Sequence, residues 1–82
     1  MKFGDALDAL FESKRIKRSG WNGANQYVYM ATGLSTSEFW LEPVQLKPAF
    51  VLRNAQGEHQ PGWIPSMGDM MAEDWEIIDP FA

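Results

Sequence analysis

Apolar residues near the start of the chain recur at the spacing of a helix. The stretch FGDALDALFESK places an apolar stripe on one side of a helix, formed by Phe3, Ala6, Leu7 and Leu10. Its acidic residues lie toward the N-terminal end and basic residues follow its C-terminal end, which suits the helix dipole. The pattern predicts an amphipathic helix over residues 3–14, with Phe11 beside the apolar stripe.

Two strands are predicted in the first half of the chain. Residues 15–18, RIKR, place Ile16 inward and Lys17 outward, which is typical of a short strand. Residues 26–31, QYVYMA, are aromatic, β-branched and apolar on both faces. A strand of this kind usually has a neighbour on each side, so we expect a helix on one face and a partner subunit on the other. Residues 32–48 contain glycine, hydroxyl residues and two prolines, and we expect them to be irregular.

The next segments predict a hairpin. Residues 49–54, AFVLRN, form a second strong strand. The sequence NAQG is typical of a hairpin turn in which Gly57 supplies a positive φ. The return strand over residues 58–64 contains Pro61, which cannot donate to a sheet ladder, so we expect this strand at an edge or with a bulge.

A short second helix and a last strand complete the predicted fold. Ser66 is a suitable N-cap for a helix over residues 66–72, and Asp69 supplies the acidic half of a capping box. Residues 74–78 then close the sheet, with Trp75 and Ile77 on one face. The class is α+β: a small antiparallel β-sheet with an N-terminal amphipathic helix and a short second helix near the C-terminus. We expect a single domain over residues 1–82.

The composition narrows the possible partners. The chain has 82 residues, a net charge of −4, no cysteine and a single histidine. An acidic balance argues against a non-specific hold on nucleic acid, although a small anion can still bind in a local pocket. No apolar run is long enough for a membrane span, and the N-terminus lacks a signal-peptide core. Because so small a domain buries little core and has no disulfide, we expect an oligomer.

Residues suited to catalysis are few. His59 stands near a hairpin turn, where we expect it to be solvated rather than to act as a general base. The acidic residues Asp69, Glu73 and Asp74 serve either capping and solubility or a hard metal ion, and capping already explains the Ser66–Asp69 spacing. No nucleophile–base pair, Gly-rich phosphate loop or G-x-S-x-G motif is evident. We therefore expect no enzyme activity, no cofactor and no metal.

Two tryptophans stand in glycine-flanked contexts that suit a binding site. Trp21 lies in GWNG and Trp63 in PGWI, and the basic residues Arg15, Lys17 and Arg18 lie just upstream of Trp21. An aromatic ring beside a guanidinium matches the needs of a nucleotide with its phosphates. The other interpretation is that Trp21 caps the core beneath the turn, because buried tryptophan is common.

The two ends of the chain resemble a known family. The helix pattern FGDALDAL, the basic strand running into RSGWNG, and the final WIPSMGDMMAEDWEI are similar to the Thoeris anti-defense 2 family of small bacteriophage proteins. The resemblance implies a non-catalytic protein that binds and sequesters cyclic ADP-ribose isomers made by TIR-domain proteins of Thoeris defence. Some members of that family also sequester cyclic dinucleotides of CBASS-type defence. The resemblance further implies a homotetramer with ligand sites between protomers, acting in the host bacterial cytoplasm.

The same resemblance suggests candidate site residues. The matching positions are Arg18, Trp21, Asn22, Trp63, Ser66 and Asp69. Trp21 is expected to stack on a purine, Asn22 to make a polar contact and Arg18 to bind a phosphate. The other three match the C-terminal motif and serve either as ligand contacts or as interface packing. We expect Trp75 to be core, and the ring of Trp21 to be exposed in one chain until a neighbouring chain and a ligand cover it.

Two other functions stay open at this point. One is a protein-interaction module that inhibits a host enzyme through apolar faces. The other is a hydrolase that degrades the same signals. The sequence does not predict which signal is preferred, whether there are one or two sites, or what residues 32–48 contribute.

Overall fold

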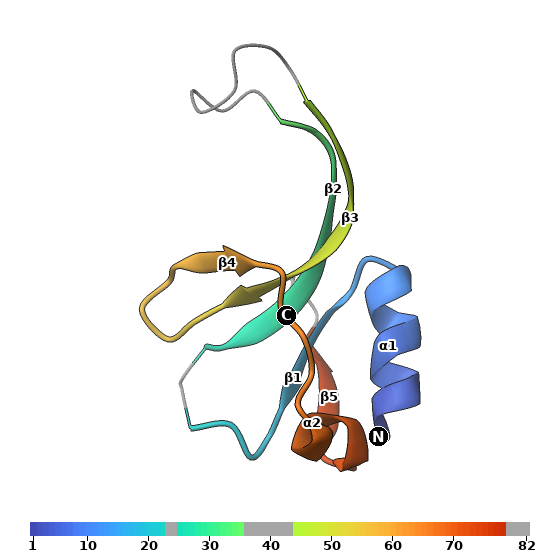
Figure 1. Cartoon of the computed structure of the whole chain (residues 1–82). Helices are drawn as coiled ribbons and strands as arrows, with labels where there is room; N and C mark the ends of the chain where they lie inside the picture. Colours follow the sequence, from blue (N-terminus) through green and yellow to red (C-terminus); the bar gives the residue numbers. More distant parts are fainter. Residues whose placement is uncertain (23–24, 36–43, 79–82) are drawn as a thin grey trace.

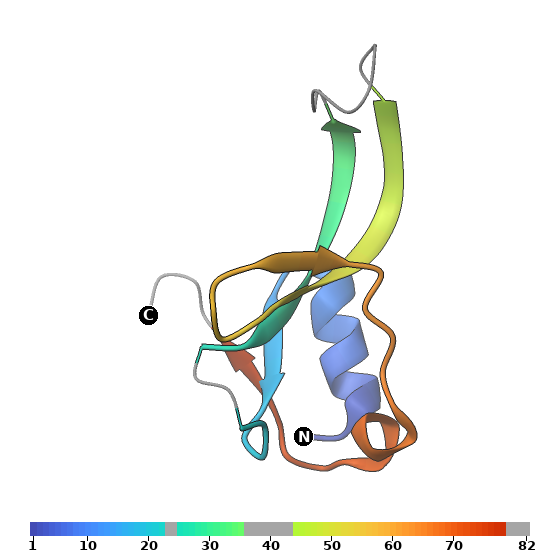
Figure 2. The same cartoon turned by 60° about the vertical axis from the view of Figure 1, so that its left-hand side comes forward.

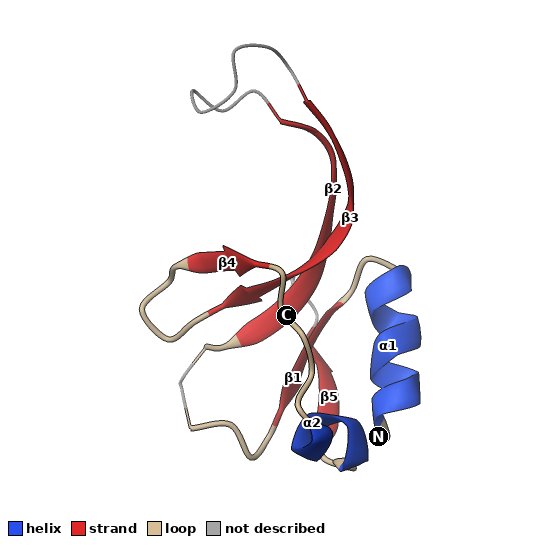
Figure 3. Cartoon of the chain, in the orientation of Figure 1, coloured by secondary structure: helices blue, strands red, loops and turns tan. Residues whose placement is uncertain are grey.

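A five-stranded antiparallel sheet organises the chain (Figures 1 and 3). The computed structural model describes residues 1–22, 25–35 and 44–78. In chain order the elements are α1 (Phe3–Phe11), β1 (Arg15–Arg18), β2 (Tyr27–Ser35), β3 (Val44–Arg53), β4 (His59–Pro61), α2 (Met67–Met71) and β5 (Trp75–Ile78). The strands lie in the order β4-β3-β2-β1-β5. This arrangement confirms the predicted α+β class.

Helix α1 lies against one face of the sheet and supplies part of the core (Figure 1). The central cluster consists of Ala6, Ala9, Leu10, Ile16, Val28 and Trp75. The predicted apolar stripe is confirmed, and Phe3 and Leu7 pack partly buried against this cluster. The helix ends at Phe11 rather than at residue 14, because Ser13 adopts a φ of 64° that no helical residue has. Phe11 is 66% exposed and therefore adds little to the buried stripe.

Strands β2 and β3 are longer than their patterns predict. They form a ribbon that projects beyond the rest of the sheet (Figures 1 and 2). The expectation that residues 32–48 are irregular is wrong for 32–35 and 44–48, which belong to the paired strands. Residues 36–43 lie outside the described residues. Both strands therefore continue into the region where the sequence suggested a loop.

A β-bulge explains how a proline fits within β3. The ladder pairs Ala31 with Ala49 and then Gly33 with Leu46, so the register shifts between these two pairs. Pro48 falls inside this shift, where a missing N–H donor costs the ladder least. Because a proline usually ends a strand pattern, the sequence predicts that this strand begins at residue 49, whereas β3 begins at Val44.

The hairpin between β3 and β4 matches its prediction. Gly57 has a φ of 86°, and its N–H donates to the Asn54 carbonyl at 3.1 Å. The Asn54 side chain accepts from the N–H groups of Gln56 and Glu58, which fixes the turn. Strand β4 is shorter than expected, and it lies at the sheet edge as Pro61 predicted.

The sheet has two faces of different character. Successive strand residues point to opposite sides, so Val28 faces α1 while Tyr27 and Tyr29 face away from it. We call the first side the helix face. We call the other side the open face, defined by Arg15, Lys17, Tyr27, Tyr29, Arg53 and His59. Strand β2 is thus apolar or aromatic on both sides, as predicted, and the partner subunit expected over the open face stays a prediction.

Candidate functional site

Five of the six predicted site residues lie together at the α2 end of the helix face. They come from the end of β1, the turn that follows it, the segment after β4, and α2, and they are Arg18, Trp21, Trp63, Ser66 and Asp69. Asp69 is the hub, since it contacts Arg18, Trp21 and Ser66. Asn22 is exposed on the adjoining turn. The sequence motifs at the two ends of the chain therefore meet in space.

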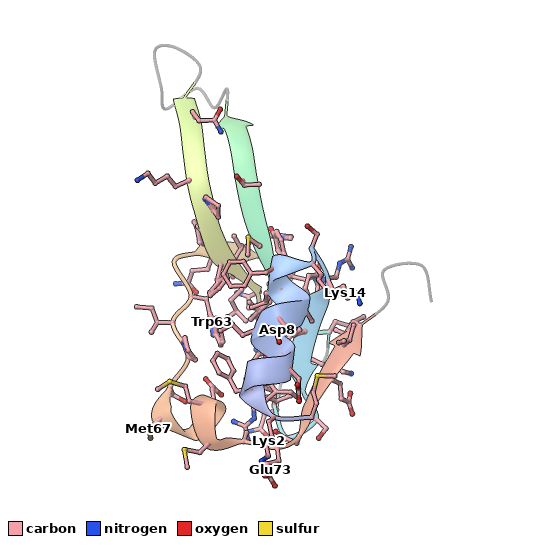
Figure 4. The ribbon with its side chains drawn as sticks, turned by 90° about the vertical axis from the view of Figure 1, so that its right-hand side faces the viewer. Lys2, Asp8, Lys14, Trp63, Met67 and Glu73 are labelled. Carbon is pink, nitrogen blue, oxygen red and sulfur yellow. The ribbon has the colours of Figure 1, made fainter. Side chains whose placement is uncertain are left out.

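The tryptophans of this region form an indole cluster of Trp21, Trp63 and Trp75. The ring centroids of Trp21 lie 5.5 Å from Trp75 and 6.5 Å from Trp63, both edge to face. Trp75 is 1% exposed and its indole N–H donates to the Asp69 carbonyl at 2.9 Å, which confirms its predicted place in the core. Figure 4, which looks onto α1, shows Trp63 beside that helix.

The position of Trp21 corrects one expectation. Its ring is partly buried by the chain itself and packs against the core, so it is not left for a second chain alone to cover. Its indole N–H also points to the Asp69 carboxylate at 3.5 Å. The Trp21 ring therefore closes the core beneath the turn, and part of its surface stays accessible.

Arg18 is held by two carboxylates of its own chain. Its Nε donates to Asp74 at 2.8 Å and its Nη1 to Asp69 at 2.9 Å. These bonds raise the pKa of Arg18 above its ordinary value, and the bond from Arg18 is the largest cause that lowers the pKa of Asp74. The Gly20 N–H also donates to Asp74 at 2.9 Å, and a Cβ at Gly20 would lie 2.8 Å from that carboxylate. Only glycine therefore permits this close approach.

Asp69 and Ser66 form the predicted capping box. The Asp69 N–H donates to the Ser66 hydroxyl at 3.1 Å, and the Ser66 N–H donates to the Asp69 carboxylate at 2.9 Å. Burial alone would raise the pKa of Asp69, but the hydrogen bonds from Ser66, Arg18 and Trp21 together lower it. Both residues thus have a structural role, and any contact with a ligand would come in addition to it.

Sequence reasoning missed Asp74 as the partner of Arg18, and it expected a partner subunit but no ligand-binding residues on the open face. On that face two guanidinium groups lie over one ring: the Cζ of Arg15 is 4.8 Å from the centroid of Tyr27, and that of Arg53 is 5.7 Å away. The signal that could have found them is the alternation within the strands, which puts Arg15 and Lys17 on one side of β1 and Tyr27 and Tyr29 on one side of β2.

Groups suited to catalysis are sparse in the described part of the chain. His59 is exposed, as expected, but it is also bonded, because its Nδ1 lies 2.7 Å from the Tyr29 hydroxyl. Within residues 1–22, 25–35 and 44–78, no three histidine or acidic side chains are grouped so as to hold a metal ion. Neither described helix has the length or apolar character needed to cross a bilayer.

The fold and the site define a class: a small antiparallel α+β domain with an indole cluster beneath its short second helix. The chain belongs to the family of the Thoeris anti-defense 2-like domain, whose model matches residues 1–78. It is also similar to the protein named Thoeris anti-defense 2 of Bacillus phage SP01. The two are 34% identical over 86 residues, a match that covers 95% of this chain and 94% of that relative. The family resemblance seen in the sequence is confirmed.

Proposed function

We propose that this protein counters Thoeris defence by binding and sequestering a cyclic ADP-ribose isomer, without converting it. Family membership and the name of the phage relative support an anti-defense role. The observation that carries the binding proposal is the pairing of Trp21 with Trp63. The two rings come from distant segments, lie 6.5 Å apart by their centroids, and are both only partly buried.

Base stacking is the main attraction in the proposed complex. Each aromatic ring that stacks on a base contributes roughly 1–3 kcal/mol, and a cyclic ADP-ribose isomer offers an adenine to the accessible surface of Trp21 or Trp63. Asn22 is exposed on the adjoining turn, and we assign it a polar contact with the ligand. Ser66 and Asp69 support the site chiefly by holding α2 in place beside the rings.

Arg18 is less available to a phosphate than the rings are to a base, because two carboxylates already bind it. An arginine has five N–H donors, and two of those of Arg18 are used by Asp69 and Asp74. A phosphate would have to take the remaining donors while staying clear of both carboxylates, because like charges repel at such short range. We therefore assign the affinity first to the rings and treat the phosphate contact of Arg18 as secondary.

Sequestration without turnover is consistent with the sparse catalytic groups among the described residues. A protein that removes a signal by binding needs tight binding, and a nanomolar Kd corresponds to about −12 kcal/mol. We propose that the protein assembles as a homotetramer with its sites between protomers and acts in the host cytoplasm. Cyclic dinucleotides are the second ligand class to be tested.

Exposed apolar side chains favour assembly, and they also suit the alternative function, in which the protein binds and inhibits a host enzyme. Ile64 is 82% exposed, Met67 70% and Met71 74%. Figure 4 shows Met67 at the outer side of α2. Such side chains are enriched at protein interfaces. The occupant is a second protomer in our proposal and a host enzyme in the alternative.

Native mass spectrometry with a panel of cyclic ADP-ribose isomers and cyclic dinucleotides tests the proposal. We expect a tetramer that carries one intact isomer per site. The ligand released by heat should then run as unchanged nucleotide on chromatography. A linear product in excess of the number of sites would identify an enzyme, and a 9.3 kDa monomer that ignores the whole panel would favour the protein-interaction alternative.

A variant pair locates the proposed site. Trp21→Phe keeps an apolar ring in the core but reduces the stacking surface, so we expect at least about tenfold weaker binding, equivalent to about 1.4 kcal/mol. Phe11→Leu is the matched control, because Phe11 is a 66% exposed ring on α1 that lies outside the indole cluster. Equal affinities for the wild type and Trp21→Phe would remove Trp21 from the site.

A further inference from the structure

The open face concentrates positive charge on a protein whose net charge is −4. The register pairs Tyr27 with Arg53, and Arg53 with His59, so these three side chains share one side of the sheet. Arg15 and Lys17 reach the same side from β1. Three cations therefore stand on this side of the sheet, remote from the indole cluster.

These side chains line a depression large enough for a small ligand. Its volume is about 400 Å³, and its walls include Arg15, Lys17, Tyr27 and Arg53. A second depression of about 310 Å³ shares Arg15 and Tyr27 and continues to the Tyr29–His59 pair. Pockets for small molecules begin at roughly 300 Å³. The Arg15–Tyr27 contact thus separates two adjacent hollows on one face.

The charges in the first depression are not neutralised by described residues. Neither Arg15 nor Arg53 has a carboxylate within 4.0 Å among residues 1–22, 25–35 and 44–78. Arg53 donates to the carbonyls of Asn25 and Asn54, which orient its guanidinium and carry no charge to cancel it. Lys17 lies 3.8 Å from Glu76, but both side chains are about half exposed, so this pair is weak.

The ring of Tyr27 holds the two guanidinium groups in place before any ligand arrives. Both lie within the range of a cation–π contact, which favours this placement and lowers the side-chain entropy that a ligand would have to remove. Guanidinium forks suit phosphate oxygens because they donate two parallel N–H bonds. Two such forks beside a lysine match an anion that carries two linked phosphates.

We propose that the open face is a second binding site, which takes a diphosphate-bearing anion through Arg15, Arg53 and Lys17. The linked phosphates come either as free pyrophosphate or as part of a nucleotide. In a nucleotide, the sugar and base extend into the second depression, where Tyr29 and His59 offer aromatic and polar contacts. The proposal is independent of the indole cluster and of the ligand assigned to it, and it requires that the depression on the open face stays free in the assembly, where a partner subunit was expected.

Titration calorimetry at low ionic strength, with pyrophosphate, ADP and adenosine as separate probes, tests this site. We expect pyrophosphate and ADP to bind and adenosine alone to bind far more weakly. Tighter binding of ADP than of pyrophosphate, kept in Trp21→Phe, assigns a nucleotide to the site, and equal or weaker binding of ADP assigns the free anion. Failure of both phosphate probes to bind overturns the proposal.

Matched variants test which cations bind the phosphates. Arg15→Gln and Arg53→Gln should each weaken pyrophosphate binding about tenfold or more, as expected for loss of a charge-assisted contact. Lys14→Gln changes the net charge equally but removes an exposed lysine that pairs with Glu12, so it should lose less than about twofold. An equal loss in all three variants would mean diffuse attraction and no site.

Two further measurements keep the test decisive. Melting curves identify any variant that fails to fold, in which case Lys17→Gln replaces it as the variant that removes a cation of the site. Trp21→Phe should bind pyrophosphate as the wild type does, because the indole cluster lies on the other face. Loss of cyclic ADP-ribose binding in Trp21→Phe, with pyrophosphate binding kept, therefore separates the two sites.

Discussion

The two faces of the sheet use the same kinds of side chain, arginines and aromatic rings, in different roles. On the helix face, Arg18 lies between Asp69 and Asp74 and joins β1 to α2 and to the segment before β5. On the open face, Arg15 lies over Tyr27 with no described carboxylate beside it. Both arginines come from the single strand RIKR. The comparison teaches that the presence of carboxylates beside the side chain, rather than the strand it comes from, decides whether an arginine stabilises the fold or remains available to a ligand.

The aromatic rings divide in the same way. On the helix face, Trp75 is fully enclosed and Trp21 and Trp63 cover it. On the open face, Tyr27 and Tyr29 pack on each other at 5.9 Å by their centroids and stay partly exposed. Rings that close a core and rings that form a platform are therefore separated by the thickness of one sheet.

The largest effect on stability is expected from the enclosed ring. Trp75→Ala should lower the free energy of unfolding by about 3–5 kcal/mol, because it removes a buried indole and leaves a cavity. An 82-residue domain has a total of roughly 4–12 kcal/mol, so this variant should be largely unfolded on warming. Urea denaturation followed by circular dichroism measures the change.

A matched arginine pair gives the next effect. Arg18→Gln should lower the melting temperature by several degrees, since it leaves Asp69 and Asp74 together without their cation. Arg15→Gln removes the same charge from the same strand and should change stability by no more than about 0.5 kcal/mol. Differential scanning calorimetry of both variants tests the contrast between the faces, and equal melting temperatures would abolish it.

Acid should weaken the helix face selectively, with a smaller effect. The pKa values of Asp69 and Asp74 are lowered in the folded chain, so their contribution to stability is present above the ordinary aspartate pKa of about 3.9. That contribution is lost as the pH falls through the lower folded values. We expect the melting temperature to decline below about pH 4.

Two variants sharpen this acid test. The double variant Asp69→Asn and Asp74→Asn should begin from a lower melting temperature and lose less of it on acidification. Asp8→Asn, which removes an exposed carboxylate on α1, should keep the wild-type slope. A double variant as acid-sensitive as the wild type would show that other groups control the decline.

Local signals in the sequence predicted much of the fold. The apolar stripe of α1, the turn at Gly57 and the Ser66–Asp69 capping box each depend on neighbours within one turn of chain, and all three are present. The ends of elements were less predictable. The bulge around Pro48 lets β3 begin earlier, and it depends on pairing with β2. Helix α1 ends in a local backbone motif, in which Ser13 has a positive φ and the N–H groups of Ser13 and Lys14 donate to the carbonyls of Leu10 and Ala9, and serine does not signal such an end as glycine does.

The candidate site was predictable to a smaller extent. The motifs brought Trp21, Trp63 and Asp69 to attention, and the fold brings them together. The pairing of Arg18 with Asp74 joins residues far apart in the chain, and no local pattern encodes it. Alternation within β1 and β2 indicates which residues share a side of each strand, but bringing Arg15, Tyr27 and Arg53 together needs the register of β1, β2 and β3.

The order of strands in the sheet has a consequence for how the chain folds. Strands β2, β3 and β4 pair with their neighbours in the sequence, whereas β1 pairs with β5, setting Arg15 against Ile78. Contacts between distant segments form slowly. Trp75, the largest fully buried side chain among the described residues, lies on β5. The core therefore cannot close until β5 has been synthesised, and until then the apolar side of α1 lacks the indole that covers it in the folded chain.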